Sequence, residues 1–188
     1  MKASHPTSPD EKEVNVHLVL LIQELVNLKR SSSIQCTVTR VRFVPKFGTQ
    51  SYTAVVDGVV QSRRTDKVLS ILEVKPTPRF GKQAPVQMQE TAEAVGWLKH
   101  QSEGVPKLQE GSRLIIYQGK KEVFLTLAAP GARYVEYLAR TVPTTTAEPE
   151  EFMKMQSFGP WSIKKETHLQ SLCWALLAFL SAAEEVAH

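Results

Sequence analysis

Two charged side chains, Glu73 and Lys75, lie inside residues 70–76, which read S-I-L-E-V-K-P and are otherwise largely apolar. In a β-strand, residues two positions apart point to the same face, so this carboxylate and this ammonium group share one side. A second apolar run upstream ends in another single carboxylate, Asp57. If the two runs pair as a hairpin, Asp57 approaches Glu73. Two carboxylates and a lysine at the edge of a sheet suit a Mg²⁺ site for phosphodiester chemistry.

These charges allow two interpretations. In the first, Asp57, Glu73 and the Val74 carbonyl oxygen hold one or two Mg²⁺ or Mn²⁺ ions, which polarise a phosphate and lower the pKa of a bound water. Lys75 then orients that water and neutralises developing charge. In the second interpretation, the two carboxylates only form salt bridges with Lys75 and Arg63 on a solvated end of the sheet. The spacing alone favours neither, since charged residues two positions apart are common in proteins of this length.

The elements that position these residues follow from hydrophobic periodicity and turn signals. Apolar residues at spacings of three and four predict helices, and alternation predicts half-buried strands. The predicted order is a lead-in (1–13), a helix (from 14), a strand (34–43), the Asp57 strand, the Glu73 strand, a helix (from about 85), two strands around 118–120, a helix (131–140) and an apolar helix (169–187). This order predicts an α/β fold with a central mixed β-sheet flanked by helices, formed as one domain by residues 14–188.

An acidic residue at the end of one strand followed by E-x-K on the next resembles the PD-(D/E)XK nuclease superfamily, which has the restriction-endonuclease-like fold. Asp57, Glu73 and Lys75 match its motif one by one, although Val56 stands where the motif name has proline. The order of elements over residues 14–127 is similar to that core. Residues 152–161, F-M-K-M-Q-S-F-G-P-W, together with the apolar C-terminal helix, resemble a PD-(D/E)XK-like group of uncharacterised fungal proteins.

The resemblance implies two further site residues. The first helix of several such nucleases contributes a metal-binding glutamate, which here would be Glu24; otherwise Glu24 is an edge residue with its head in solvent. Related nucleases also place a glutamine on the helix after E-x-K, near the metal-bound water. A helical projection aims Gln87 inward with the apolar stripe, and Gln89 or Glu90 takes its place if the register differs. A glutamine that caps local backbone is the alternative for Gln87.

Nucleic acid is the expected partner, with DNA favoured over RNA. The chain has 188 residues, a net charge of +4 and a pI near 9.1, which suit a polyanionic ligand but also an ordinary soluble protein. Arg79 and Lys82 lie in a loop rich in proline and glycine directly after the E-x-K strand, where they can meet a phosphate backbone. Exposed loop cations without a ligand are the other interpretation.

The cysteines and the N-terminus predict an intracellular protein, nuclear or cytoplasmic. Cys36 and Cys173 have no C-x-x-C spacing, so we expect free thiols rather than zinc. The first residues lack the apolar segment, about 7–15 residues long, of a secretory signal. The apolar part of the last helix, residues 172–183, is shorter than the roughly 20 residues that cross a bilayer, so we expect no membrane partner.

The last helix also supports a second class of function. Its apolar surface must be covered by the sheet or by another chain, which allows a homo-oligomer through this helix. A protein that keeps the nuclease fold without cutting, and acts as a nucleic-acid-binding or protein-interaction scaffold, therefore competes with the nuclease. Divalent metal should raise the melting temperature of a nuclease and leave that of a scaffold unchanged.

Overall fold

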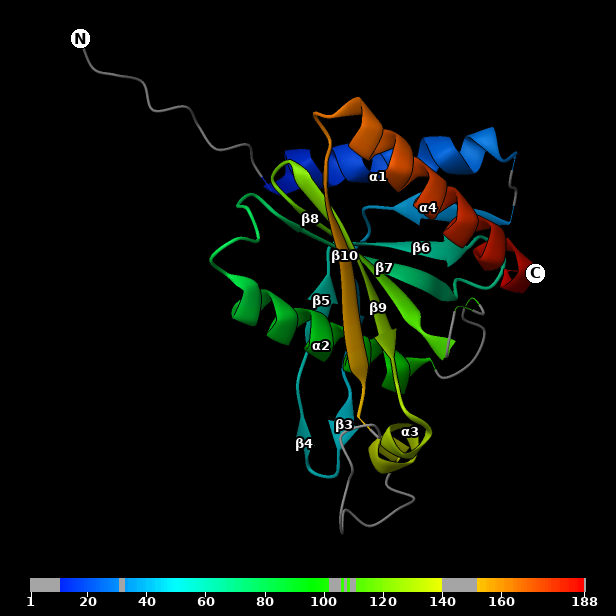
Figure 1. The fold of residues 1–188 in the computed structure, drawn as a ribbon. Coiled ribbons are helices and arrows are strands. Elements are labelled where there is room, and N and C mark those ends of the chain that lie inside the picture. Colours follow the sequence, from blue (N-terminus) through cyan, green and yellow to red (C-terminus); the bar gives the residue numbers. More distant parts are fainter. Residues whose placement is uncertain are drawn as a thin grey trace.

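A mixed six-stranded sheet forms the centre of the protein (Figure 1). The computed structural model describes residues 11–30, 33–101, 106, 108, 111–139 and 152–187. The strand order of the sheet is β1 (Ile34–Thr37), β6 (Gly58–Ser62), β7 (Val68–Lys75), β8 (Arg113–Gly119), β9 (Glu122–Ala129) and β10 (Lys154–Ser162). Two small hairpins lie outside it: β2 (Val41–Phe43) with β5 (Ala54–Val56), and β3 (Lys46–Phe47) with β4 (Gln50–Ser51).

Four helices accompany the sheet in the described part of the chain: α1 (Glu11–Leu28), α2 (Gln83–His100), α3 (Ala132–Ala139) and α4 (Glu166–Val186). Strands β7 and β8 are parallel, and α2 forms the crossover between them; the other neighbouring strands of the sheet are antiparallel. The predicted α/β fold with a mixed sheet and a C-terminal helix is therefore confirmed.

The two faces of the sheet are covered by different helices. Helices α1 and α4 lie side by side on one face, and α2 lies on the other (Figure 1). Strand β7 is buried along almost its whole length, as expected for a central strand with helices on both sides. Leu72 and Val74 point into the core beneath α1 and α4, whereas Ile71 points into the core beneath α2. Residue 73 therefore faces the α2 side.

Glycine at position 58 allows β6 to pack closely against β1. A Cβ atom at Gly58 would lie 2.6 Å from the carbonyl oxygen of Thr37 in β1. Gly58 begins β6 and pairs with Leu72, while the backbone N–H of Asp57 donates to the carbonyl of Leu72 at 3.0 Å. The apolar run that ends at Asp57 forms β5 in another sheet, so the expected hairpin is shifted: β7 pairs with β6, which begins directly after Asp57.

Several predicted boundaries are wrong. The strand expected over residues 34–43 is broken at Val38 to Arg40 and forms β1 and β2 in different sheets. Helix α1 begins at Glu11, inside the predicted lead-in, and most of that lead-in lies outside the described residues. Strand β10 was not predicted: proline, glycine and an exposed face remove the usual alternation. The helix expected over 131–140 is confirmed as α3.

Helix α4 begins three residues earlier than predicted and has 21 residues, so its length and composition would allow it to cross a membrane. Core helices of soluble proteins can have the same length and apolar composition. Five residues of α4 are buried in the core shared with α1: Leu172, Leu176, Phe179, Leu180 and Ala183. The absence of a membrane partner stays a prediction. Both cysteines are free thiols, as expected.

Candidate active site

Asp57 is fixed against the central strand by both of its carboxylate oxygens. Oδ2 accepts a hydrogen bond from the backbone N–H of Val74 at 3.1 Å, and Oδ1 accepts one from the guanidinium of Arg40 at 3.0 Å. The residue is buried. Because β6 leads away from Asp57 beside β7, this carboxylate lies next to the strand segment that carries Glu73.

Glu73 and Lys75 share one face of β7, as the spacing predicts. Lys75 Nζ donates to Glu73 Oε1, and only 2% of Glu73 is exposed. Their shared side is therefore not a solvated sheet end. Arg63, the other predicted salt-bridge partner, instead donates to the Ile34 carbonyl and to Gln35. Asp57 pairs with Arg40 rather than with Arg63.

A third carboxylate, Glu93 of α2, joins this group. The Gln89 amide Nε2 donates to Glu73 Oε1 at 2.5 Å and to Glu93 Oε1 at 2.8 Å, so one side chain bridges the two. Glu93 is 2% exposed. The other oxygens, Glu73 Oε2 and Glu93 Oε2, are buried and have no hydrogen-bond partner among the described residues. Two unpaired acceptors in this position are costly unless a cation or protons reach them.

The pKa values of the two glutamates also indicate that the cluster favours protons or a cation. Burial raises the pKa of Glu93 to about 9, and the neighbouring charge of Glu73 adds to the effect. Burial also raises the pKa of Glu73, against the opposing influence of the Lys75 ammonium, while the Asp57 carboxylate raises it further. Like charges held together in a low-dielectric site favour protons or a metal cation.

The donor set fits a hard divalent cation in its chemistry. Carboxylate oxygens are preferred by Mg²⁺ and Mn²⁺, and the orphaned oxygens of Glu73 and Glu93 are of this kind. As arranged, one oxygen of Glu73 contacts Lys75 and one of Asp57 contacts Arg40. Within the described ranges, no three His, Cys, Asp or Glu side chains form a ready-made metal cluster, so Lys75 or Arg40 would have to yield an oxygen for all three carboxylates to bind one ion.

Gln87 is not where its predicted role requires it. Its side chain is exposed, whereas Gln89, the alternative given for a different register, reaches Glu73. The predicted phase of this helix, with Gln87 pointing inward, is therefore wrong by one position along the helix. The buried face of α2 includes Val86, Glu90, Glu93, Ala94 and Trp97. Trp97, the bulkiest residue of the helix, indicates this phase in the sequence.

Glu24 does not join the cluster either. It is exposed and accepts a hydrogen bond from Asn27 of the same helix at 3.3 Å. Helix α1 covers the face of the sheet opposite to Glu73. Glu24 is therefore an edge residue, the other interpretation given for it, and Glu93 supplies the third carboxylate from α2 instead.

The two loop cations have different surroundings. Lys82 is exposed just before α2 and remains available for a phosphate. Arg79 is buried: its guanidinium forms two hydrogen bonds to Glu90, at 3.0 and 2.9 Å, and a longer one to Ser157 at 3.4 Å. The expectation of an exposed Arg79 is wrong, because an oppositely charged partner eleven residues away draws it into the interior. Burial raises the pKa of Glu90, and Arg79 opposes that rise.

Comparisons with protein-family models, curated proteins and solved structures find no match for this chain.

Proposed function

We propose that this protein is a metal-dependent nuclease of the PD-(D/E)XK type. The observation that carries the proposal is the meeting of Asp57, Glu73 and Lys75 at the β6–β7 hairpin, with two buried carboxylate oxygens left without partners beside them. The parallel β7–α2–β8 crossover after E-x-K, inside a mixed sheet, supports a restriction-endonuclease-like core.

Asp57, Glu73 and Glu93 would hold the Mg²⁺ or Mn²⁺, with the Val74 carbonyl as the predicted backbone ligand. Such an ion would polarise the phosphate and lower the pKa of a bound water. The Val74 N–H already fixes Asp57 against β7. Gln89 fixes Glu73 and Glu93 relative to each other, so the chain provides an oriented set of oxygens before the substrate arrives.

In this proposal, the Lys75 side chain contacts the attacking water and the scissile phosphate. Its ammonium contacts Glu73 in the present arrangement. With a cation held by Glu73, the Lys75 ammonium would be the protein group that orients the attacking water and stabilises negative charge in the transition state. Gln89 replaces Gln87 as the glutamine of this site and acts as a positioning residue for the two carboxylates.

The proposed substrate is nucleic acid, with DNA favoured over RNA. The net charge of +4 and the exposed Lys82 beside the site suit a phosphate backbone. Arg79 has no part in backbone contact in this proposal, because its charge is already paired with Glu90.

The non-cleaving scaffold is the second candidate function, and two observations favour it. Lys75 and Arg40 already neutralise one oxygen each of Glu73 and Asp57, so the cluster has protein counter-charges. Trp174 of α4 is also 67% exposed, which leaves an aromatic surface for another chain or a second copy. In this case divalent metal leaves the melting temperature unchanged.

The deciding experiment measures cleavage of labelled single- and double-stranded DNA and RNA with Mg²⁺ or Mn²⁺. It compares the wild type with Glu73→Ala and with the matched control Glu24→Ala. We expect cutting by the wild type and by the control, and a loss of at least about 100-fold in Glu73→Ala, as for other groups that stabilise transition-state charge. Both variants should remain folded, because Glu24 is exposed and Glu73 belongs to none of the apolar core clusters.

Each result has a definite meaning. Full activity in Glu73→Ala refutes the site, and equal losses in both variants point to a general effect of removing a carboxylate. If no sample cuts and metal does not raise the melting temperature, the scaffold is the better description.

A further inference from the structure

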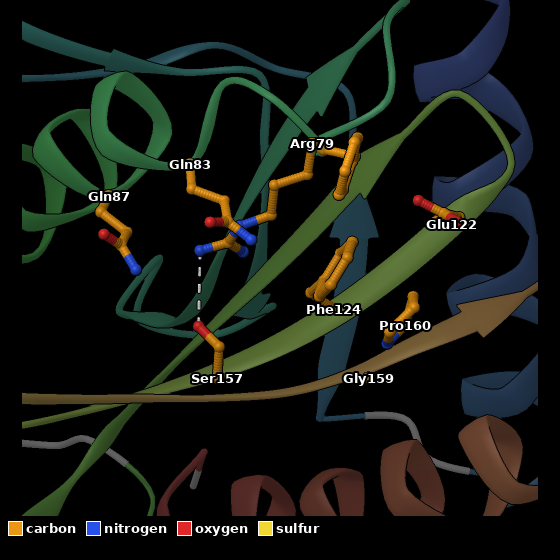
Figure 2. Close-up of a pocket in the computed structure, with 9 residues that line it drawn as sticks. Arg79, Gln83, Gln87, Glu122, Phe124, Ser157, Gly159 and Pro160 are labelled. Atoms are coloured by element: carbon orange, nitrogen blue, oxygen red, sulfur yellow. Dashed lines mark hydrogen bonds between the residues drawn. The ribbon is translucent and has the colours of Figure 1, made fainter.

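A pocket opens on the α2 side of the sheet, over β9 and β10 (Figure 2). Its volume is about 280 Å³, slightly below the roughly 300–1,000 Å³ of typical small-molecule sites, which suits a single planar group. Its lining combines aromatic rings, side-chain amides, a hydroxyl and a carboxylate: Arg79, Phe80, Gln83, Gln87, Glu122, Phe124, Ser157, Gly159 and Pro160.

The inner wall of the pocket is rigidly built. Figure 2 shows Arg79 reaching from the loop before α2 to Ser157 of β10. Its guanidinium lies 4.9 Å from the centroid of the Phe124 ring and 5.2 Å from that of Tyr117, in the range of cation–π contacts. The two hydrogen bonds to Glu90 hold it in this position. Arg79 thus fixes the Phe124 ring instead of contacting a ligand phosphate.

The outer wall is exposed. Phe80 is 87% exposed, a large apolar ring in water at the mouth of the pocket. Gln83 and Gln87 come from successive turns of α2 and present their amides from the same side (Figure 2). Neither glutamine has a hydrogen bond from its side-chain amide to a described residue. A ring and two amides are thus presented to whatever enters.

The pocket shares a sheet face with the carboxylate cluster. Glu73 pairs with Tyr117 across β7 and β8, and Tyr117 pairs with Phe124 across β8 and β9. Directly paired residues point to the same face, so these three side chains form a row. Two strand spacings place Phe124 roughly 10 Å from Glu73, which is the length of about three stacked nucleotide steps. A strand whose phosphate lies at Glu73 therefore reaches the pocket within a few nucleotides.

We propose that this pocket binds one unstacked nucleobase of a single-stranded nucleic acid, a few nucleotides from the scissile phosphate. The inference rests on the proposed nuclease function for the course of the strand. Phe80 and Phe124 provide stacking surfaces, as aromatic side chains do for splayed bases. Gln83 and Gln87 can donate to and accept from a base edge, and Glu122 can accept from an exocyclic amino group.

The charges of the lining select a base over a phosphate. The positive charge of Arg79 is paired with Glu90, and Glu122 adds a carboxylate to the rim. The lining therefore offers no unpaired cation, so a phosphate group would enter without compensation for its lost hydration. A neutral heteroaromatic ring with hydrogen-bonding edges meets stacking surfaces and amides instead. The inferred substrate class is a single strand, or a duplex with a splayed end.

The test measures binding without cleavage, in EDTA, by fluorescence anisotropy of the full chain. It compares single-stranded DNA and RNA of about 12 nucleotides with abasic strands of the same length and charge. We expect the wild type to prefer the base-bearing strands by about 5- to 150-fold. Phe80→Ala and Gln87→Ala should lower this ratio several-fold. The matched control is Met88→Ala, another exposed position of α2 that does not line the pocket.

The ratio cancels the contribution of the phosphates, so it reports the bases alone. A wild-type ratio near one, no binding of either strand, or the same ratio in Phe80→Ala, Gln87→Ala and Met88→Ala would each overturn the inference. Base preference without metal-dependent cutting supports the pocket and rejects the nuclease. Metal-dependent cutting together with equal affinity for base-bearing and abasic strands supports the nuclease and rejects the base-binding pocket.

Discussion

The two faces of strand β7 differ in how they are stabilised. On one face, Leu72 and Val74 belong to the apolar core beneath α1 and α4. On the other, Glu73 meets Gln89 and Glu93 of α2, and two of the carboxylate oxygens are buried without partners. The first arrangement is what burial of apolar area favours. The second lowers stability, because an unpaired buried acceptor loses its hydration.

A strand with one stabilising and one costly face indicates where the chain is constrained by something other than folding. Sites that break local rules of stability tend to be functional. The α2 face also separates two kinds of charge: Arg79 and Glu90 are fully paired, whereas Glu73 and Glu93 are not. This difference predicts that the first pair maintains structure and the second pair performs chemistry.

The largest expected loss of stability follows from breaking the paired charges. Arg79→Ala leaves Glu90 buried without its partner, which typically lowers the free energy of unfolding by about 3–5 kcal/mol. The double variant Arg79→Met with Glu90→Met removes both charges at similar volume and should recover most of the loss. Urea denaturation measures both. If Arg79→Ala costs less than about 1 kcal/mol, the pair is not the support of this face.

Substitutions at two neighbouring residues of β7 should affect different properties, one the stability of the protein and the other its cleavage activity. Leu72→Ala empties part of the core and should lower the free energy of unfolding by about 2–5 kcal/mol, while the folded fraction keeps its cleavage rate per molecule. Glu73→Gln removes a carboxylate from beside Glu93 and Asp57, so it should keep or raise the stability above pH 7 and abolish cleavage. Thermal denaturation and single-turnover cleavage below the melting temperature test the pair. Loss of stability in Glu73→Gln would contradict the comparison.

The unpaired carboxylates should make the metal-free protein less stable at higher pH. The pKa of Glu93 is raised to about 9 by burial, against about 4.3 in an unfolded chain, so the folded state binds its proton more tightly. The contribution is fully present below about pH 4 and is lost as the pH rises through about 9, by at most about 1.4 kcal/mol per pH unit per proton. The raised pKa of Glu73 acts in the same direction.

Denaturation in EDTA between pH 5 and pH 9 measures this loss. Glu93→Gln should reduce the slope, whereas the exposed Glu24→Gln should leave it unchanged. Saturating Mn²⁺ should also reduce it, because a bound cation replaces the protons. An unchanged slope in Glu93→Gln would mean that this carboxyl titrates normally in the folded protein.

The features that could be predicted from the sequence depend on strict local geometry. A spacing of two fixes Glu73 and Lys75 on one face of any strand, and the turn between two apolar runs brings Asp57 to the same end. The α/β fold with a mixed sheet follows from the order of apolar patterns. These inferences do not require knowledge of distant contacts.

The features that were missed depend on partners distant in the sequence. The phase of α2 is set by buried Glu90 and Glu93, which a projection of apolar residues counts as solvent-facing. Arg79 appears as an exposed loop cation until Glu90 and the rings of Tyr117 and Phe124 surround it. Strand β10 lacks alternation because much of it is exposed at the sheet edge.

The smallest effect on stability is expected at Arg40, whose ion pair with Asp57 contrasts with the Arg79–Glu90 pair. The Arg40 side chain is 62% exposed, so water screens its charge, and Arg40→Ala should lower the free energy of unfolding by at most about 1 kcal/mol. The same change frees Asp57 Oδ1 from a competing cation. Mn²⁺ should then bind more tightly, as isothermal titration would show, with Arg42→Ala as the control. Weaker Mn²⁺ binding in Arg40→Ala would mean that Arg40 holds Asp57 in place for the metal rather than competing with it.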